Sequence, residues 1–237
     1  IFRAYPVLDR ELHARYGIRE MKMRNRLKHT AVWAAALLLL TAVPAASQNT
    51  AQPPQPHGNV ADLKVTDKDY TLGPKDAKIV LIEYASLTCS HCAQFHTQVL
   101  PGLKKEFIDT GKIRYIYRDF PLDRLALGAA MIAQCSGRDT FFGFIETFYG
   151  SQSNWARASN PPQALAKLAR LGGMSQNEFD QCLQNVDIQN EILQQRLQAS
   201  NDFKVQSTPT VFVNGDRYGG GMSLDQFRTL LNGMISE

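Results

Sequence analysis

The chain has 237 residues, of which 44% are hydrophobic, 20% charged and 9% aromatic. These proportions are typical of a globular protein and exclude a collagen-like, coiled-coil or wholly disordered chain. The net charge of +4 comes from the N-terminal part, because residues 1–46 contain 8 of the 26 Lys and Arg but only 3 of the 22 Asp and Glu. The rest of the chain, with 18 basic and 19 acidic residues, is nearly neutral, and this disfavours a nucleic-acid partner.

The N-terminal part has the three components of a secretory signal peptide. A cationic stretch at 21–28 is followed by an apolar run at 31–43 and by the small residues 45–47, the usual layout of such a signal. The apolar run has 13 residues, fewer than the ~20 that a membrane helix needs, and an uncleaved anchor is the alternative. We therefore predict an upstream extension at 1–20, a signal peptide at 21–46 and export of the chain.

After a Pro/Gln-rich linker at 47–66, the sequence alternates between strand and helix patterns. In chain order it predicts a strand over 78–85, a helix over 90–108 with a kink at Pro101, a strand over 113–120, a helical block over about 122–202 with N-caps at Asn160 and Ser175, a hairpin from Pro209 to Tyr218 around Asn214-Gly215, and a helix over 223–234. The single-helix crossover between the first two strands implies that they are parallel neighbours. The order β-α-β, helical block, β-β-α predicts an α/β fold with a helical insertion between its two halves.

Two of the four cysteines form a Cys-x-x-Cys segment where the first predicted strand gives way to the first predicted helix. Cys89 would lie at the helix N-cap, where free N–H groups and the helix dipole favour a thiolate, and Cys92 would face the interior. His91 adds a donor or a positive charge near Cys89. Because a thiolate is the attacking species in disulfide exchange, we predict redox catalysis. The alternatives are a local structural disulfide or half of a zinc site, but no second Cys-x-x-Cys or His pair follows at zinc-finger spacing.

Several motifs together resemble the DsbA-like branch of the thioredoxin superfamily, in its exported bacterial members. They are Glu-Tyr-Ala-Ser-Leu-Thr-Cys-Ser-His-Cys at 83–92, Ser-Thr-Pro-Thr at 207–210 and Tyr-Gly-Gly-Gly-Met-Ser-Leu-Asp-Gln-Phe at 218–227. The resemblance covers about 67–237 and implies a thioredoxin-like fold with a helical-domain insertion at about 122–202, between the βαβ and ββα halves. Ser90 stands where the best-known members carry Pro. Because this dipeptide tunes the redox potential, the departure bears on oxidising strength and not on the type of reaction.

The resemblance also assigns roles to residues outside the cysteines. Pro209 matches the cis-proline whose loop faces the active-site sulfurs and pairs with the substrate backbone, and Thr208 would contact the disulfide. An ordinary trans proline at the start of a strand is the alternative. Glu83 matches the buried carboxylate beneath the active site, which exchanges protons with Cys92. The alternative for Glu83, an exposed strand face, is disfavoured by the apolar run around it.

The other two cysteines, Cys135 and Cys182, lie on different helices of the predicted insertion. In an oxidising compartment they could form a structural disulfide, which would close a loop of 48 residues and contribute about 2–4 kcal/mol. Some DsbA-like proteins resemble this chain in having a second disulfide in the helical domain. The alternative is a second redox centre, for which no supporting residues lie near either cysteine.

His96 follows Cys92 by four residues and would share a helix face with it. A copper or zinc site formed by the active-site cysteines with His91 and His96 is therefore a further alternative. A helix that buries Cys92 points it away from such a centre. We expect a surface or core histidine at this position, with neither a metal nor a cofactor.

These observations predict an exported, periplasmic thiol:disulfide oxidoreductase. We expect an oxidase that donates the Cys89–Cys92 disulfide to reduced secreted proteins through a mixed disulfide, and a membrane redox partner that resembles DsbB. The nearest alternative is an isomerase or reductase on the same scaffold. Isomerases of this superfamily carry an oligomerisation segment, whereas the linker shows no heptads, so we expect a monomer. A copper- or zinc-binding protein that uses the Cys-Ser-His-Cys site is the alternative from another class.

Overall fold

The computed structural model describes residues 54, 56, 60 and 63–236, and the described fold belongs to the unit Asn49–Glu237. The predicted upstream extension and signal peptide, 1–46, lie outside the described residues, as does most of the predicted linker, 47–66. Among the residues that the structure describes, no helix combines the length and apolar character required to cross a membrane.

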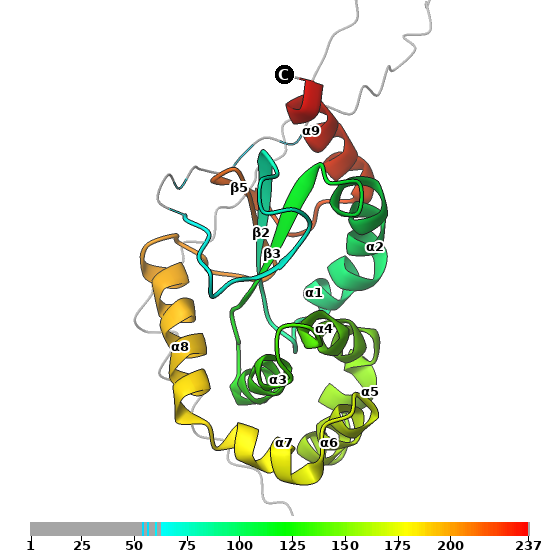
Figure 1. The fold of residues 1–237 in the computed structure, drawn as a ribbon, viewed down its shortest axis with the longest axis vertical. Helices are drawn as coiled ribbons and strands as arrows, with labels where there is room; N and C mark the ends of the chain where they lie inside the picture. The colour runs from blue at the N-terminus through cyan, green and yellow to red at the C-terminus, as the bar shows by residue number, and fades with distance from the viewer. Residues whose placement is uncertain (1–53, 55, 57–59, 61–62, 237) are drawn as a thin grey trace, which may run out of the picture. The chain divides into compact units, whose positions relative to one another are not determined.

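A five-stranded mixed sheet lies at the centre of the described fold (Figure 1). Its strands are β1 (Tyr70–Leu72), β2 (Ile79–Ala85), β3 (Ile113–Asp119), β4 (Thr210–Val213) and β5 (Asp216–Gly219), in the order β1-β3-β2-β4-β5. As predicted, β2 and β3 are parallel neighbours joined by a helix, whereas β1, β4 and β5 pair with their neighbours in the antiparallel sense. The α/β fold with a helical insertion between its β-α-β and β-β-α halves is confirmed.

The two edges of the sheet differ in how well the sequence predicts them. β1 was not predicted, because it has only three half-buried residues and therefore no visible alternation. At the other edge the predicted turn at Asn214-Gly215 is confirmed. Both residues have positive φ, 49° and 89°, as the tight turns that best match strand twist require. The Asn214 side chain also accepts a hydrogen bond of 2.8 Å from the Val80 N–H, which fixes the hairpin against β2.

The helix after β2 is continuous over 90–108 but unevenly wound. It consists of α1 (Ser90–Gln94), the π-helical turn η1 (Phe95–Val99), α2 (Leu100–Leu103) and the π-helical turn η2 (Lys104–Ile108). Pro101, where a kink was predicted, therefore lies between two wide turns. Because proline lacks an N–H and its ring crowds the preceding turn, a wider turn accommodates it. Gly102 allows the last helix, α9 (Leu224–Ser236), to approach closely, since a Cβ here would lie 2.3 Å from Leu224 Cδ2.

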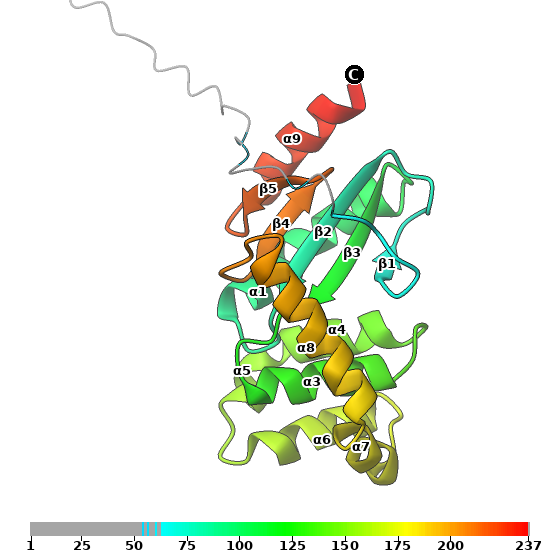
Figure 2. The same ribbon diagram turned by 90° about the vertical axis from the view of Figure 1, so that its left-hand side faces the viewer.

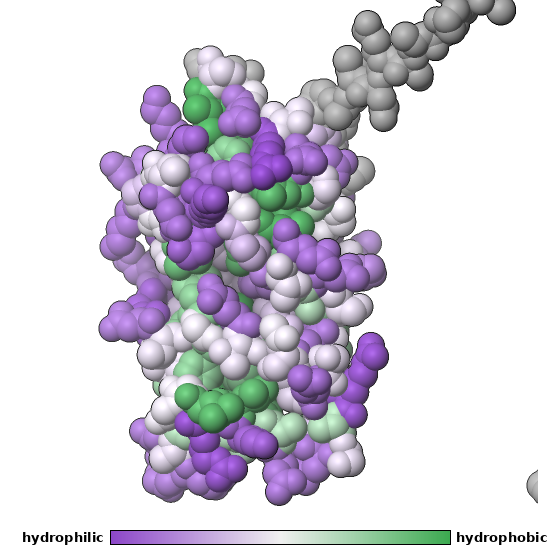
Figure 3. Space-filling model, turned by 90° about the vertical axis from the view of Figure 1, so that its right-hand side faces the viewer, coloured by the Kyte–Doolittle hydropathy of each residue, from purple (hydrophilic) through white to green (hydrophobic). Residues whose placement is uncertain are grey.

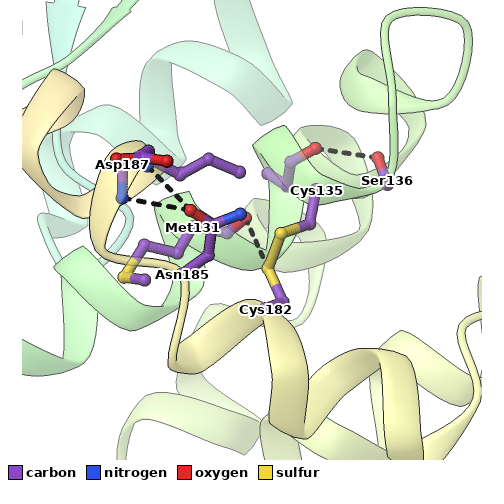
Figure 4. The surroundings of a disulfide bond; sticks show 8 residues. Met131, Cys135, Ser136, Cys182, Asn185 and Asp187 are labelled. Atoms are coloured by element: carbon purple, nitrogen blue, oxygen red, sulfur yellow. Dashed lines mark hydrogen bonds between the residues drawn. A yellow bond between two sulfur atoms is a disulfide. The ribbon is translucent and has the colours of Figure 1, made fainter.

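A block of helices connects β3 to β4 (Figures 1 and 2). Its members are α3 (Arg124–Cys135), α4 (Phe141–Gly150), α5 (Gln152–Ala156), α6 (Pro161–Leu171), α7 (Gln176–Leu183) and α8 (Val186–Asn201). The predicted N-caps at Asn160 and Ser175 are confirmed, the latter as a capping box with Glu178. A disulfide joins Cys135 at the end of α3 to Cys182 in α7, with their Cα atoms 6.1 Å apart (Figure 4). It ties two helices that are distant in sequence into one block.

The two faces of the sheet are covered by different side chains. One face packs against α1, α2, α4 and α9 in a large core that contains Tyr115, Phe148 and Phe227. The opposite face forms a smaller core, in which Tyr84 and Phe212 pack beside the C-terminal end of α8. Figure 2 shows α8 returning from the helical block to the sheet. On the face drawn in Figure 3, apolar side chains gather only in small separate groups among hydrophilic ones, because the large apolar residues are turned inward.

Candidate active site

The Cys-x-x-Cys segment lies where the central strand β2 leads into α1. Cys89 has an extended backbone (φ −78°, ψ 121°) and is the N-cap of α1, as predicted, while its carbonyl accepts the first helical hydrogen bond, 3.1 Å from the Ala93 nitrogen. Both cysteines are free thiols; Cys89 is half-buried and Cys92 is fully buried. The first sulfur is therefore accessible at the helix N-terminus, and the second faces the core.

The surroundings of the two sulfurs move their proton affinities in opposite directions. The hydrogen bond from the Cys92 thiol, aided by Thr208 and by backbone N–H groups at the helix start, lowers the pKa of Cys89 to about 5 against the effect of its partial burial. Burial raises the pKa of Cys92, and the hydrogen bond to Cys89 and the charge of Glu83 raise it further. At neutral pH the reduced site therefore holds one half-buried, accessible thiolate and one buried thiol.

The backbone of His91 contributes to this site. Its N–H is one of the groups that lower the pKa of Cys89. The ring is exposed, and its Nδ1 lies 3.3 Å from Gln94 Oε1. The structure thus gives His91 a backbone contribution at Cys89, and the expected side-chain donor or positive charge stays a prediction.

The loop before β4 lies opposite the nucleophile. The Thr208–Pro209 peptide bond is cis, and Cys89 Sγ lies 3.2 Å from the Thr208 carbonyl oxygen. Pro209 is buried, and Gly220, just beyond β5, packs directly on it, since a Cβ at Gly220 would lie 2.0 Å from the Pro209 carbonyl oxygen. The structure therefore brings Thr208 and Pro209 to Cys89 across about 120 residues of chain, as the resemblance implied, and Gly220 provides the space for this loop.

The helical insertion holds the segment that precedes Cys89. Gln152 of α5 donates hydrogen bonds to the carbonyls of Leu87 and Cys89, at 2.8 and 2.9 Å. The Thr88 hydroxyl donates to Asp123, the N-cap of α3, at 2.7 Å. Sequence reasoning missed Gln152 and Asp123, because hydrogen bonds over 63, 65 and 35 residues leave no spacing pattern.

Beneath Cys92 the structure buries the predicted carboxylate. Glu83 is fully buried, and its Oε2 accepts a short hydrogen bond from the Tyr115 hydroxyl. The same oxygen lies 3.0 Å from His96 Nε2. His96 is thus a core histidine, one of the two positions expected for it, but it is paired with Glu83, which the sequence pattern did not reveal.

The same geometry bears on the alternative of a metal site. Among residues 63–236 and the few described before them, no group of three or more His, Cys, Asp and Glu side chains is arranged to hold a metal ion. His91 is directed to Gln94 on the surface, whereas His96 is directed to Glu83 in the core. The two imidazoles do not converge on the cysteines.

Comparisons with known proteins place this geometry in a family. The family model described as Thioredoxin matches residues 65–233. The crystal structure of Wolbachia pipientis alpha-DsbA1 has 33% sequence identity and a TM-score of 0.69, over 73% of this chain and 94% of that one. The chain is a DsbA-like member of the thioredoxin superfamily. The resemblance inferred from the motifs is thereby confirmed.

Curated relatives of this DsbA-like chain carry related names. A putative protein-disulfide oxidoreductase of Rickettsia felis is 35% identical over 176 residues, which are 74% of this chain and 63% of the relative. The DsbA-like chain thus spans less than two thirds of that relative's length. BdbD from Bacillus subtilis, with 18% identity and a TM-score of 0.66, shares the fold.

Proposed function

We propose that this DsbA-like chain is an exported thiol:disulfide oxidoreductase that works as an oxidase, donating a Cys89–Cys92 disulfide to client proteins. The observation that carries the proposal is the inequality of the two sulfurs, with the pKa of Cys89 lowered to about 5 by its hydrogen bonds and the Cys92 thiol buried. A stabilised thiolate favours the dithiol form of the enzyme, so the disulfide form is an oxidant. The same low pKa makes Cys89 a good leaving group.

The reaction requires two exchanges at the same sulfur. A client thiolate attacks Cys89 Sγ, the Cys89–Cys92 bond breaks, and Cys92 leaves as a thiolate that takes a proton from the buried polar groups behind it. A second client thiolate then attacks the client sulfur of the mixed disulfide, and Cys89 leaves as a thiolate. The client gains one disulfide and the enzyme gains the two electrons.

The loop at Thr208 and Pro209 supports recognition of an extended client backbone. A hollow of about 510 Å³ adjoins this loop, and its lining includes Ser207, Pro209 and Gly220 together with the long side chains of Lys204, Arg217 and Tyr218. Main-chain groups of the loop would pair with an extended client backbone whatever its side chains are. We therefore infer that the substrates are reduced exported proteins in general.

The compartment and the electron acceptor follow from the direction of the reaction. The signal-like segment 21–46 and a disulfide between Cys135 and Cys182 in the helical insertion support an oxidising compartment outside the cytoplasm, which we take to be the periplasm. Each turnover leaves the enzyme reduced, so it needs an oxidant that accepts two electrons. We propose a membrane protein resembling DsbB for this step and a monomeric enzyme.

Equilibration of the full chain with glutathione buffers tests the proposal. In glutathione buffers in which ordinary structural disulfides stay oxidised, the Cys89–Cys92 pair of an oxidase is expected to be mostly reduced. The reduced form of the enzyme is also expected to melt at a higher temperature than the oxidised form. The extra stability of the reduced form is fully present above pH 9.0, the ordinary Cys value, and is lost as the pH falls through about 5. Equal or reversed melting at neutral pH would favour a reductase or isomerase.

A further inference from the structure

Behind the active site, the structure buries a carboxylate and an imidazole against each other. The side chains of Glu83 and His96 are 0% and 1% exposed, and Oε2 and Nε2 are 3.0 Å apart. Burying an ionisable pair generally costs as much free energy as the pair recovers, and an apolar pair of the same volume would be at least as stable. Stability alone therefore does not account for the pair.

The other titratable neighbours of the pair, apart from Cys92, keep their protons. Tyr115 of β3 donates its hydroxyl to Glu83. The His96 ring stacks on Tyr149 of α4 at 4.1 Å and lies 5.6 Å from the ring of Tyr117. Burial raises the pKa of all three tyrosines well above the ordinary value. These three hydroxyls therefore do not exchange protons near neutral pH, which leaves Glu83, His96 and Cys92 as the groups to consider.

One nitrogen of the imidazole is left to take up a proton. With Nε2–H donated to Glu83, the atoms Glu83 Oε1 and His96 Nδ1 are buried and have no hydrogen-bond partner in the part of the chain that the structure describes. Histidine is the side chain that ordinarily changes its charge between about pH 5 and 8. Protonation at Nδ1 would place a positive charge directly against the Glu83 carboxylate.

We propose that His96 is a positioning residue that sets how readily Glu83 takes a proton from Cys92 or returns one, so that Glu83 and His96 act as a single proton store behind the nucleophile. The inference rests on the proposed function and adds to it His96, which acts on the disulfide exchange through Glu83. A cationic His96 stabilises the carboxylate, so Glu83 accepts the Cys92 proton poorly. A neutral His96 leaves Glu83 a better base. The ease with which Glu83 accepts a proton from Cys92, or returns it, therefore depends on pH.

Closure of a glutathione mixed disulfide isolates this proton transfer. In the first step the Cys89 thiolate of the reduced protein attacks oxidised glutathione and releases one glutathione thiolate. In the second step the Cys92 proton moves to Glu83, the Cys92 sulfur attacks Cys89 Sγ, and the bond between Cys89 and glutathione breaks. The second glutathione leaves as a thiolate, and the two electrons stay with the two glutathione molecules. Only the second step uses the buried pair.

The decisive experiment measures the rate of this second step from pH 5 to 8 in the full chain. His96→Gln keeps an N–H donor for Glu83 but cannot become cationic. We expect the two proteins to close at similar rates at pH 8, and His96→Gln to close about tenfold faster than wild type at pH 5, because Glu83 has no cationic neighbour in the variant. Gln98→Ala, at an exposed position of the same helix, should follow the wild-type profile.

A constant ratio between His96→Gln and wild type at every pH would mean that His96 is only structural and would overturn the inference. If His96→Gln does not fold, the imidazole ¹⁵N signals of His96 in the wild type decide instead. They should differ between the dithiol and disulfide forms, and signals that are the same in both forms contradict the inference. If wild type does not oxidise a dithiol peptide but the ratio of the closure rates of His96→Gln and wild type still changes with pH, only the proposed oxidase function is rejected.

Discussion

The molecule contains two cysteine pairs with contrasting surroundings. Cys89 and Cys92 are three residues apart at one helix N-terminus, are free thiols, and have pKa values that hydrogen bonding and burial move in opposite directions. Cys135 and Cys182 are 47 residues apart on two helices and form a disulfide. The first pair lies against the loop at Thr208 and Pro209, whereas the second links helices that pack on each other (Figure 4).

We infer from this difference that the surroundings of a cysteine pair, and not its presence, determine what it does. A thiolate that is stabilised at an accessible helix end exchanges readily. A disulfide between two packed helices restricts the unfolded chain and so stabilises the fold. We therefore assign exchange to the first pair and stabilisation to the second, and each of the following substitutions tests one side of this assignment.

The largest expected effect is that of removing the nucleophile. Cys89→Ser should abolish oxidation of a dithiol peptide, because no other accessible thiolate is available to form the mixed disulfide. Cys92→Ser should instead retain a reactive Cys89 and accumulate mixed disulfides, which intact-protein mass spectrometry detects. Peptide oxidation by Cys89→Ser at the wild-type rate would place the exchange at another pair.

The next effect should be on stability and not on activity. Replacement of both Cys135 and Cys182 by Ser should lower the free energy of unfolding by about 2–4 kcal/mol, since the unfolded chain regains the entropy of the open loop. Urea denaturation measures this loss. Peptide oxidation by the folded double variant should stay at the wild-type rate, and a large decrease would show that the second disulfide takes part in exchange.

A pair of neighbouring glycines tests the loop opposite Cys89. Gly220→Ala would place a Cβ 2.0 Å from the Pro209 carbonyl oxygen and displace the loop, so peptide oxidation should slow by about 10- to 100-fold. Gly221→Ala is the matched control, because among the described residues nothing lies within 4 Å of a Cβ there. Equal rates for the two variants would show that the position of Pro209 does not matter for the exchange.

The smallest expected effect is that of Gln152, which holds the segment before Cys89. Gln152→Ala removes its hydrogen bonds to the Leu87 and Cys89 carbonyls and should lower the free energy of unfolding by about 1 kcal/mol. The rate at which Cys89 is alkylated at pH 7 should change little. Ser153→Ala, at the adjacent exposed position, serves as the control and should match the wild type in both measurements.

The sequence was sufficient for the parts of the site that depend on local order along the chain. A buried strand followed by a helix places Cys89 at the N-cap and Cys92 inside, and the Asn-Gly turn defines the last hairpin. The family resemblance added Thr208 and Pro209, which lie more than 100 residues from the cysteines.

The parts that could not be predicted depend on side-chain contacts between elements. The partner of Glu83 is fixed by the packing of the helix on β2, and a histidine four residues after Cys92 indicates only a shared helix face. The bonds of Gln152 arise from the placement of α5 against the active-site segment. The apolar run around Glu83 indicated that this carboxylate is buried, but it could not identify His96 as its partner.

The central claim is that Cys89 is a thiolate at neutral pH, and its titration tests this directly. Thiolate absorbance of the reduced protein, with Cys89→Ser as the blank, should show half-ionisation near pH 5, because the hydrogen bond from Cys92 and the helix N–H groups lower the pKa of Cys89 to about 5. Half-ionisation near 9.0, the ordinary value for cysteine, would contradict the account.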